Sequence, residues 1–476
     1  MEASQNDQLN NLLEKYIREK ALPALMKFIE IPNLSSAFDP EWATNGLLEK
    51  ACEFCIDFAK EMDIKGLKVD MYQEEGKTPL MFGIAEPTRQ GNFKNLVMYG
   101  HIDKQPHLTE GWSEGLHPTK PVIKDGLLYG RGGVDDGYNF FTIVCMLKAL
   151  QDLDIAYDRM VLFYETDEES NSDDIPFWMK KFEKEIGIPE IMFCLDAGTV
   201  SNKIFSLSTT LRGCVNFDLT VRVLEQGAHS GLSSGIVPSS FRIIRQLLDR
   251  IECSKSGKIY DELQVLIPDD KLAQAREVVK VLGDDIHKNF CMCKGVKPVS
   301  DDIEELYLNN LWRSQLEIIG QEGIPDKNVS GNVLRPFTTL RCSLRIPPTI
   351  TGEAAFDQVK ETLTKDAPYG AHIEVNRVGT GTGWNCNEIP NKVIEILDKH
   401  NQAIFGTKTL LFGCGGSIPF VKVIQDCLPE TLLFVTGLML PTSNIHAPDE
   451  NIDIEYWIKF TKSLTGFLVD FANVQA

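Results

Sequence analysis

Histidine and acidic side chains follow short apolar segments at several places far apart in the chain. Each segment has the length and composition expected of a buried β-strand. The polar residues at or just after their ends are His101, Asp103, Glu168, Glu169, Asp196 and His446, and Asp135 and Asp136 close a glycine-rich stretch that begins at Gly130. In open α/β sheets, functional groups collect at the carboxyl ends of the strands, so these side chains can meet in space.

Strand-like segments alternate with helical patterns through most of the chain. Strands are predicted at 67–71, 80–85, 95–99, 159–164, 191–195, 409–412 and 432–435, and helices at 8–33, 45–62, 138–150, 174–186, 391–405, 418–427 and 455–473. This alternation predicts an α/β fold in which helices cover both faces of a mostly parallel sheet.

The pattern changes near Arg212. Long alternating strands are predicted at 214–224 and 337–346, with a shorter strand at 371–378, helices at 238–252 and 353–365, and a charge-rich stretch at 253–310. This order favours an inserted α+β domain with an antiparallel sheet. The predicted division is therefore one α/β domain in two parts, 1–211 and 383–476, interrupted by a smaller domain at 212–382.

Size and composition limit the number of domains and the classes of partner. A chain of 476 residues is too long for one ordinary core. The formal net charge of −20 argues against binding of nucleic acid or an anionic membrane. No apolar run reaches the length of a membrane-spanning helix, and the N-terminus lacks a secretion signal. The twelve cysteines lack zinc-site spacing and are predicted to be free thiols of a cytoplasmic protein.

The residue types at the strand ends suit a pair of divalent ions. His101 and Asp103 are two residues apart, so one can bind a metal while the other orients the imidazole. Asp135 can bridge two cations, although the Asp pair could instead cap the following helix. Glu168 and Glu169 point apart, so one can bind a metal while the other moves a proton. By itself, this acidic stretch would be interpreted as a solvated loop.

Three further features lie outside that set. His229 is flanked by glycines in Gly227–Gly231, and it could stabilise an oxyanion or simply lie in a loop. Arg345, near the end of a long strand, could bind a substrate carboxylate or face solvent. The stretch Cys414–Pro419 precedes a helix, and its free backbone N–H groups could hold an anion.

Three phrases closely resemble one enzyme family. They are Gly-His-Ile-Asp-Lys-Gln-Pro at 100–106, Leu-Tyr-Gly-Arg-Gly-Gly-Val-Asp-Asp at 128–136 and Gly-Gly-Ser-Ile-Pro at 415–419. They resemble the co-catalytic metallopeptidase family of carnosine dipeptidases, desuccinylases and aminoacylases, and most of all its cytosolic non-specific dipeptidase branch. The resemblance implies a phosphorylase/hydrolase-like catalytic domain, an inserted α+β lid and dimerisation domain, a homodimer formed through the lid, and often a cis peptide between Asp135 and Asp136.

The resemblance also implies two divalent ions per subunit. His101, Asp135 and Asp196 would bind one ion, and Asp135, Glu169 and His446 would bind the other. The expected metal is Zn²⁺, with Mn²⁺ as the alternative, because carboxylate-rich sites tolerate it.

Other residues match family positions that act on the substrate. Glu168 would be the general acid/base, and Asp103 would orient His101. His229 would cross a dimer interface to polarise the scissile carbonyl in the neighbouring subunit. The substrate's C-terminal carboxylate would be held by Arg345, Gly416 and Ser417, and Asn332 is a looser match to a further substrate contact.

These implications predict a dipeptidase in which a water between the two ions attacks the peptide carbonyl. The first alternative is a deacylase or carboxypeptidase that acts on N-acyl amino acids, so the expected substrate is a dipeptide or an acylated amino acid. The second is a catalytically silent scaffold that keeps the fold. Two departures leave the substrate open: Gly137 follows the Asp pair where dipeptidases usually have Lys-Gly, and Gly383–Cys386 contains no His.

Overall fold

The computed structural model describes residues 3–474, which divide into two compact units. The first unit contains the residues up to Ser208, Cys386–Leu411 and the residues from Val423 onward, and the second contains Thr209–Asn385 and Phe412–Lys422. The predicted division placed the two boundaries three residues away, at 211/212 and 382/383, and it left 412–422 with the α/β domain. In the structure this segment bonds within the second unit, where the Ser417 hydroxyl donates to the Arg212 carbonyl oxygen over 2.7 Å.

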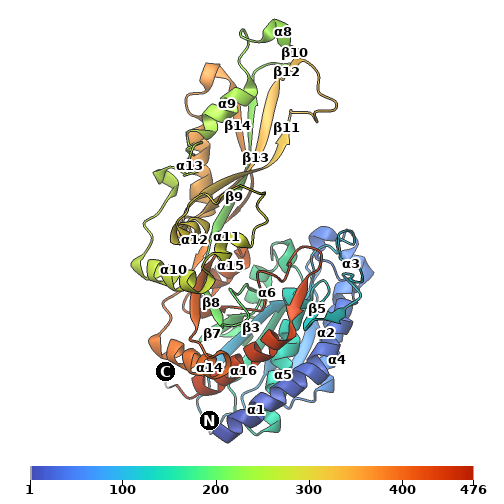
Figure 1. Cartoon of the computed structure of the whole chain (residues 1–476). Helices are drawn as coiled ribbons and strands as arrows, with labels where there is room; N and C mark the ends of the chain where they lie inside the picture. The colour runs from blue at the N-terminus through green and yellow to red at the C-terminus, as the bar shows by residue number, and fades with distance from the viewer. Residues whose placement is uncertain (1–2, 475–476) are drawn as a thin grey trace. The chain divides into compact units, whose positions relative to one another are not determined.

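The first unit is a large sheet covered by helices (Figure 1). Its strands are β1 (Leu67–Tyr72), β2 (Leu80–Ala85), β3 (Asn95–His101), β6 (Arg159–Glu165), β7 (Ile191–Cys194) and β17 (Leu432–Val435). The same sheet also contains β8 (Ser206–Leu211), β15 (Trp384–Asn385) and β16 (Leu410–Cys414); β15 and the last residues of β8 and β16 belong to the second unit. A small separate sheet contains β4 (Val122–Lys124), β5 (Leu127–Tyr129) and β18 (Asn451–Asp453).

The helices of the first unit follow the predicted positions closely. They are α1 (Ala3–Tyr16), α2 (Leu22–Ile29), α3 (Trp42–Asn45), α4 (Leu47–Glu61), α5 (Tyr138–Asp152), α6 (Ile175–Lys181), α7 (Glu183–Ile186), α14 (Asn391–Phe405) and α16 (Ile454–Phe471), and α15 (Pro419–Cys427) begins in the second unit. A π-helical turn at Ile17–Ala21 joins α1 to α2, so the helix predicted at 8–33 contains an irregular turn. None of the described helices is long and apolar enough to cross a membrane.

The large sheet is mixed, and the prediction of a mostly parallel sheet was wrong at both edges. The strand order is β1-β2-β6-β3-β7-β17-β8-β15. Along this order, the central pairings β6–β3, β3–β7 and β7–β17 are parallel. The outer pairings β1–β2, β2–β6, β17–β8 and β8–β15 are antiparallel. The segment between Tyr72 and Leu80 explains the first of these, because it is too short for the crossover that parallel neighbours need.

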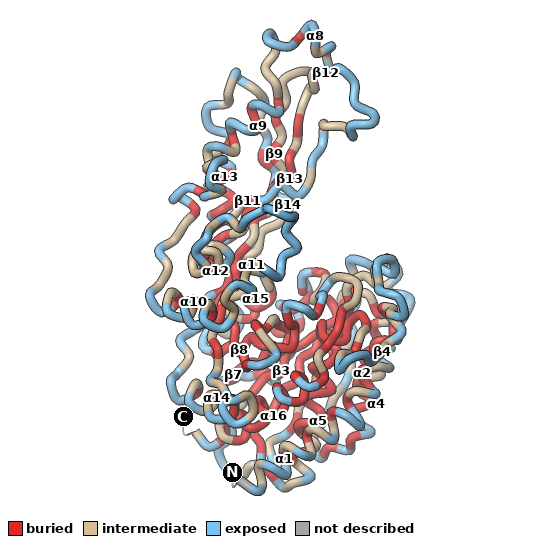
Figure 2. The backbone as a smooth tube through the Cα atoms, viewed as in Figure 1, coloured by how far each residue is buried: buried red, intermediate tan, exposed pale blue. Residues whose placement is uncertain are grey.

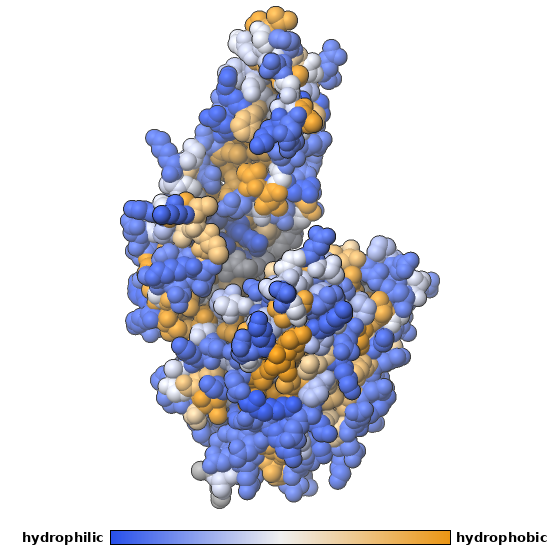
Figure 3. Space-filling view, turned by 45° about the vertical axis from the view of Figure 1, so that its right-hand side comes forward, coloured by the Kyte–Doolittle hydropathy of each residue, from blue (hydrophilic) through white to orange (hydrophobic). Residues whose placement is uncertain are grey.

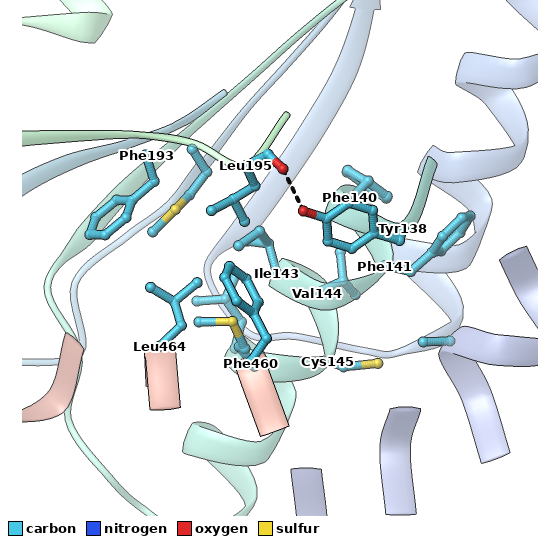
Figure 4. Packing of buried hydrophobic residues seen from close by; sticks show 14 of the residues in the cluster. Tyr138, Phe140, Phe141, Ile143, Val144, Cys145, Phe193, Leu195, Phe460 and Leu464 are labelled. Atoms are coloured by element: carbon cyan, nitrogen blue, oxygen red, sulfur yellow. Dashed lines mark hydrogen bonds between the residues drawn. The ribbon is translucent and has the colours of Figure 1, made fainter. Parts of the chain in front are cut away.

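The core of the first unit lies between the central strands and α5, where buried residues concentrate (Figure 2). Residues on nearly every face of α5 are buried, because the sheet covers one side and α1, α4 and α16 pack on the others. The Tyr138 hydroxyl, in the first turn of α5, donates to the Leu195 carbonyl oxygen (Figure 4). This bond ties the helix to the strand end that precedes Asp196.

The second unit contains a four-stranded antiparallel sheet in the order β11-β13-β9-β14. Its strands are β11 (Gln315–Glu322), β13 (Phe337–Ile346), β9 (Gly213–Arg222) and β14 (His372–Gly381), and a two-stranded ribbon pairs β10 (Ala228–His229) with β12 (Val333–Leu334). The helices are α8 (Ser230–Ser233), α9 (Ser240–Leu248), α10 (Asp269–Leu282), α11 (Asp285–Lys288), α12 (Ile303–Leu311) and α13 (Gly352–Thr364). Burial alternates along β9, and its buried side chains pack with α9 and α13. A sheet with helices on one face results.

Candidate metal centre

His101, Asp135 and Asp196 lie close together in the first unit. His101 is the last residue of β3, Asp196 follows β7, and Asp135 lies in the irregular turn that leads into α5. His101 Nε2 is 3.2 Å from Asp135 Oδ1 and 3.7 Å from Asp196 Oδ1. All three side chains are buried, and their ligand atoms lie within 4.8 Å of one another. A group of this size and chemistry can bind one divalent ion.

A second group shares Asp135 with the first. His446 Nε2 is 3.0 Å from Asp135 Oδ2 and 3.3 Å from Glu169 Oε2. Asp135 therefore turns one carboxylate oxygen toward each imidazole, which is the arrangement that a bridging carboxylate needs. His446 lies in a loop with a φ of 58°, and its side chain is 52% exposed. The peptide bond between Asp135 and Asp136 is cis, as the family resemblance implied.

Asp103 connects His101 to the glutamate pair. Asp103 Oδ1 accepts a hydrogen bond from Glu168 N over 3.3 Å, and Oδ2 accepts one from Glu169 N over 3.1 Å. His101 Nδ1 lies 3.1 Å from the Asp103 carbonyl oxygen and 3.4 Å from Asp103 Oδ1. Because both neighbours of Nδ1 are acceptors, Nδ1 carries the proton of the neutral imidazole, and Nε2 offers its lone pair to the site.

Gln105 is a contact of the site that the sequence analysis missed. Its Nε2 donates to Glu169 Oε2 over 2.6 Å, whereas Glu169 Oε1 is buried without a hydrogen-bond partner among residues 3–474. A buried carboxylate oxygen in this situation is costly unless a cation faces it. Its position two residues after Asp103 could have indicated that Gln105 also lies near the site.

Acidic side chains outnumber basic ones around the two ligand groups, and the pKa values of these side chains are shifted accordingly. Burial raises the pKa of Glu168, Glu169 and Asp196, and the charge of Asp196 raises that of Glu168 further. Burial opposes charge on His101, but the negative charge of Asp196 raises the pKa of that imidazole. Divalent cations would replace protons as the counter-charge here. The donor set of imidazole nitrogens and carboxylate oxygens fits Zn²⁺ or Mn²⁺.

Local packing explains the glycines at 137 and 383, but it does not explain why Gly383–Cys386 contains no His. A β-carbon on Gly137 would lie 2.5 Å from Gly132 O and 2.6 Å from Phe28 Cε1, so packing against α2 leaves no room for a side chain. A β-carbon on Gly383 would lie 2.6 Å from Leu211 O. Both positions therefore require glycine in this fold, whatever substrate the chain binds.

Arg345, Gly416 and Ser417 come together in the second unit. Arg345 Nη1 donates to Ser417 Oγ over 2.9 Å, and Gly416 is the exposed residue of the same turn. The sequence analysis missed a second guanidinium at this place. Arg212 Nε donates to Gly415 O over 3.0 Å, and burial, followed by the charge of Arg345, lowers the pKa of Arg212 to about 10. Two neighbouring guanidiniums beside an exposed turn suit a carboxylate ligand.

His229 and Asn332 lie at the other end of this unit's sheet. His229 pairs with Val333, and Ser230 N donates to Asn332 O over 2.9 Å. Arg345 pairs with the start of β9, whereas the β10–β12 ribbon follows its far end. At about 3.3 Å per residue, these two ends of β9 are about 26 Å apart. His229 and Arg345 of one chain therefore do not reach the same small substrate.

The chain is similar to known proteins over most of its length. Residues 97–470 match the model of peptidase family M20/M25/M40. The cysteinylglycine-S-conjugate dipeptidase of Corynebacterium striatum is 24% identical over 392 residues, covering 82% of this chain and 83% of that protein. The Cys-Gly metallodipeptidase DUG1 of Saccharomyces cerevisiae is 25% identical over 392 residues, covering 79% of each chain. The solved structure of human carnosine dipeptidase 1 matches with a TM-score of 0.75 and 20% identity over 98% of this chain and 99% of that one, a likeness in fold.

Proposed function

The chain belongs to peptidase family M20/M25/M40 and is a metallopeptidase, and from this premise we propose that it hydrolyses dipeptides at the metal centre of its first unit. Family membership confirms the resemblance inferred from the sequence. Both sequence relatives are named dipeptidases, which supports a dipeptide substrate. The observation that carries the proposal is the pair of ligand groups that share Asp135.

Glu168 is the proposed general acid/base. It lies in the turn after β6, within 4.8 Å of His101 and Glu169 when ligand atoms are compared, and its backbone N–H is held by Asp103. Burial raises the pKa of the Glu168 carboxyl, so this group can take a proton from the attacking water and keep it until the leaving amine accepts it. Asp103 positions this turn and His101 together.

Bound divalent ions would polarise the scissile carbonyl and lower the pKa of the attacking water. His101, Asp135 and Asp196 would hold one ion, and Asp135, Glu169 and His446 would hold the other. Zn²⁺ suits the two imidazoles, and Mn²⁺ is the alternative that the carboxylates would accept. Gln105 would keep Glu169 from rotating away from its ion.

The substrate's C-terminal carboxylate is proposed to bind at Arg345, Gly416 and Ser417, with Arg212 beside them. The contact between Arg345 and Ser417 supports this role, because it already places a guanidinium and a hydroxyl at one exposed turn. A free carboxylate is also present in N-acyl amino acids, so the same contact supports a deacylase or carboxypeptidase as the second candidate.

A homodimer is proposed because Arg345 lies beside one end of β9, and the ribbon that carries His229 follows the other end, about 26 Å away along the strand. His229 would then act on a substrate held by the neighbouring subunit. Two exposed apolar residues beside it support a contact surface: Leu232 is 77% and Ile236 is 82% exposed, and apolar side chains gather around α8 (Figure 3). A cytoplasmic location is also proposed, because all twelve cysteines are free thiols.

The test is a substrate panel on protein reconstituted with Zn²⁺ or Mn²⁺. Dipeptides should be cleaved faster than N-acetyl and N-succinyl amino acids. Glu168→Gln should lower kcat by about 10²–10⁴-fold, the usual contribution of a general acid/base, while leaving metal content unchanged. Glu74→Gln, a surface carboxylate paired with Lys181, is the matched control and should be as active as the unaltered enzyme. Cleavage of acylated amino acids alone would favour the deacylase, and a Glu168→Gln protein of full activity would refute the assigned role.

A further inference from the structure

A buried ion pair lies beside the metal centre and is not among its ligands. Arg131 Nη1 donates to Glu450 Oε2, and the two side chains are 1% and 0% exposed. A buried charge pair is costly to desolvate, so it indicates a requirement for a specific arrangement more than a gain in stability.

The hydrogen bonds of this pair reach three ligand-bearing segments. Glu450 Oε1 accepts from Gly132 N over 2.9 Å and from Gly133 N over 3.1 Å, three and two residues before Asp135. Arg131 Nε donates to Pro106 O over 3.1 Å, in the segment that follows His101. Arg131 Nη2 donates to Ala447 O over 3.2 Å, and Ala447 is the neighbour of His446 in the chain.

The two imidazoles differ in how much other structure holds them. His101 ends a central strand and is fully buried. His446 lies in a turn and has a positive φ, and its side chain is about half exposed. The contacts at Ala447 and Glu450 lie within four residues of His446 and attach its loop to the glycine turn that carries Asp135. The distance between His446 and Asp135 therefore depends on this attachment far more than the distance between His101 and Asp135 does.

We propose that Arg131 and Glu450 are a positioning pair that sets the metal affinity of the Asp135–Glu169–His446 group. The inference rests on the proposed function, because it assumes that this group binds the second of two ions. The pair would not bind the ion itself but would orient residues that do, and loss of such a contact typically weakens metal binding by about 10–100-fold.

Glu450→Gln in the full chain is the test variant. It removes the negative charge but keeps a carbonyl oxygen for the N–H groups of Gly132 and Gly133. Zn²⁺ affinity and stoichiometry are measured by equilibrium dialysis and calorimetry, and Co²⁺ absorption reports the two environments. One ion should bind as in the unaltered protein, and the other should bind about 10–100-fold more weakly. Asp158→Asn, which removes one partner of the ion pair with Arg89 elsewhere in this unit, is the matched control and should bind both ions normally.

A double-variant cycle identifies the ion that is weakened. In a His446→Ala background, Glu450→Gln should have no further effect on metal affinity. In a His101→Ala background, it should still weaken the remaining ion. Equal weakening of both ions, or unchanged binding of both, would overturn the proposal. If Glu450→Gln does not fold, Arg131→Lys replaces it, because lysine keeps the charge but loses the contacts with Pro106 and Ala447, and the same selective weakening is expected.

A different result would disprove the proposed function itself. If the unaltered protein binds only one ion per chain, the two-ion mechanism is wrong, and this result appears before any variant is compared. If it binds two ions and Glu450→Gln leaves both affinities unchanged, only the positioning role is lost. The unfolding midpoint of the metal-free proteins, measured in parallel, separates a general loss of stability from the selective effect.

Discussion

Gly100→Ala should destabilise the first unit and disturb its metal centre through one added methyl group. Gly100 precedes His101 in β3, and a β-carbon there would lie 2.3 Å from Asn139 Nδ2, 2.4 Å from Asp136 Oδ2 and 2.8 Å from Tyr164 Cε1. The three neighbours are between 0% and 1% exposed, so none can turn into solvent to make room.

The magnitude follows from two terms. Overpacking in a well-packed core costs about 1–3 kcal/mol. The methyl group also pushes on the Asn139 amide, which donates to Tyr99 O over 2.9 Å and to Asp136 Oδ2 over 2.8 Å. Leaving a buried polar group without its partner costs about 1–3 kcal/mol. Together these terms predict a loss of about 2–6 kcal/mol in the free energy of unfolding.

Urea unfolding followed by circular dichroism measures this loss, and Zn²⁺ titration of the same samples reports the effect on His101. Gly198→Ala is the matched control, because a β-carbon there comes no closer than 3.7 Å to Met439 O. The control should change stability by less than about 1 kcal/mol, as expected for ordinary van der Waals contact. A Gly100→Ala protein as stable as this control would refute the claim that the neighbours of β3 cannot move apart.

Three further predictions concern charge. Removal of divalent ions with a chelator should lower the thermal unfolding midpoint, because an ion present at 100 times its Kd adds about 2.7 kcal/mol to the free energy of unfolding. Calorimetry with and without re-added Zn²⁺ measures this effect, and an unchanged midpoint would contradict the prediction. Burial lowers the pKa of Lys104 from 10.5 to about 7. Between these pH values the unfolded chain binds more protons than the folded chain, so the free energy of unfolding should rise with pH. Lys104→Met should flatten that rise, as measured by urea unfolding at successive pH values, and an unaltered slope would count against this prediction. Arg345→Gln should raise KM for dipeptides by about 10–100-fold with little change in kcat, an effect that would disappear with C-terminally amidated substrates.

Periodicity was sufficient to locate most strands and helices. The predicted strand at 337–346 and helix at 391–405 coincide with β13 (Phe337–Ile346) and α14 (Asn391–Phe405). Both have one buried face, so burial imposes a regular pattern on the sequence. In contrast, β8 was missed because its residues, Ser-Leu-Ser-Thr-Thr-Leu, carry hydroxyls at buried positions. Some of these hydroxyls form tertiary hydrogen bonds, such as Thr209 Oγ1 donating to Phe412 O over 3.1 Å, and a local sequence pattern does not reveal such bonds.

The candidate ligands could be grouped from sequence because strand ends in an α/β sheet lie at one edge. The contacts that hold those ligands could not be found in the same way. Gln105 reaches Glu169 across 64 positions of the chain, and Arg131 reaches Glu450 across 319. Such pairs follow from how distant loops pack, and neither the spacing nor the residue types in one segment encode that packing.

The hydrogen bond from Tyr138 to the Leu195 carbonyl oxygen couples the buried core of the first unit to the edge of the sheet that carries the candidate ligands. A helix enclosed by apolar neighbours begins three residues after Asp135 and is anchored one residue before Asp196. Any loosening along α5 would be transmitted to both ligands. Natural selection for turnover would thus also act on side chains that no substrate ever meets.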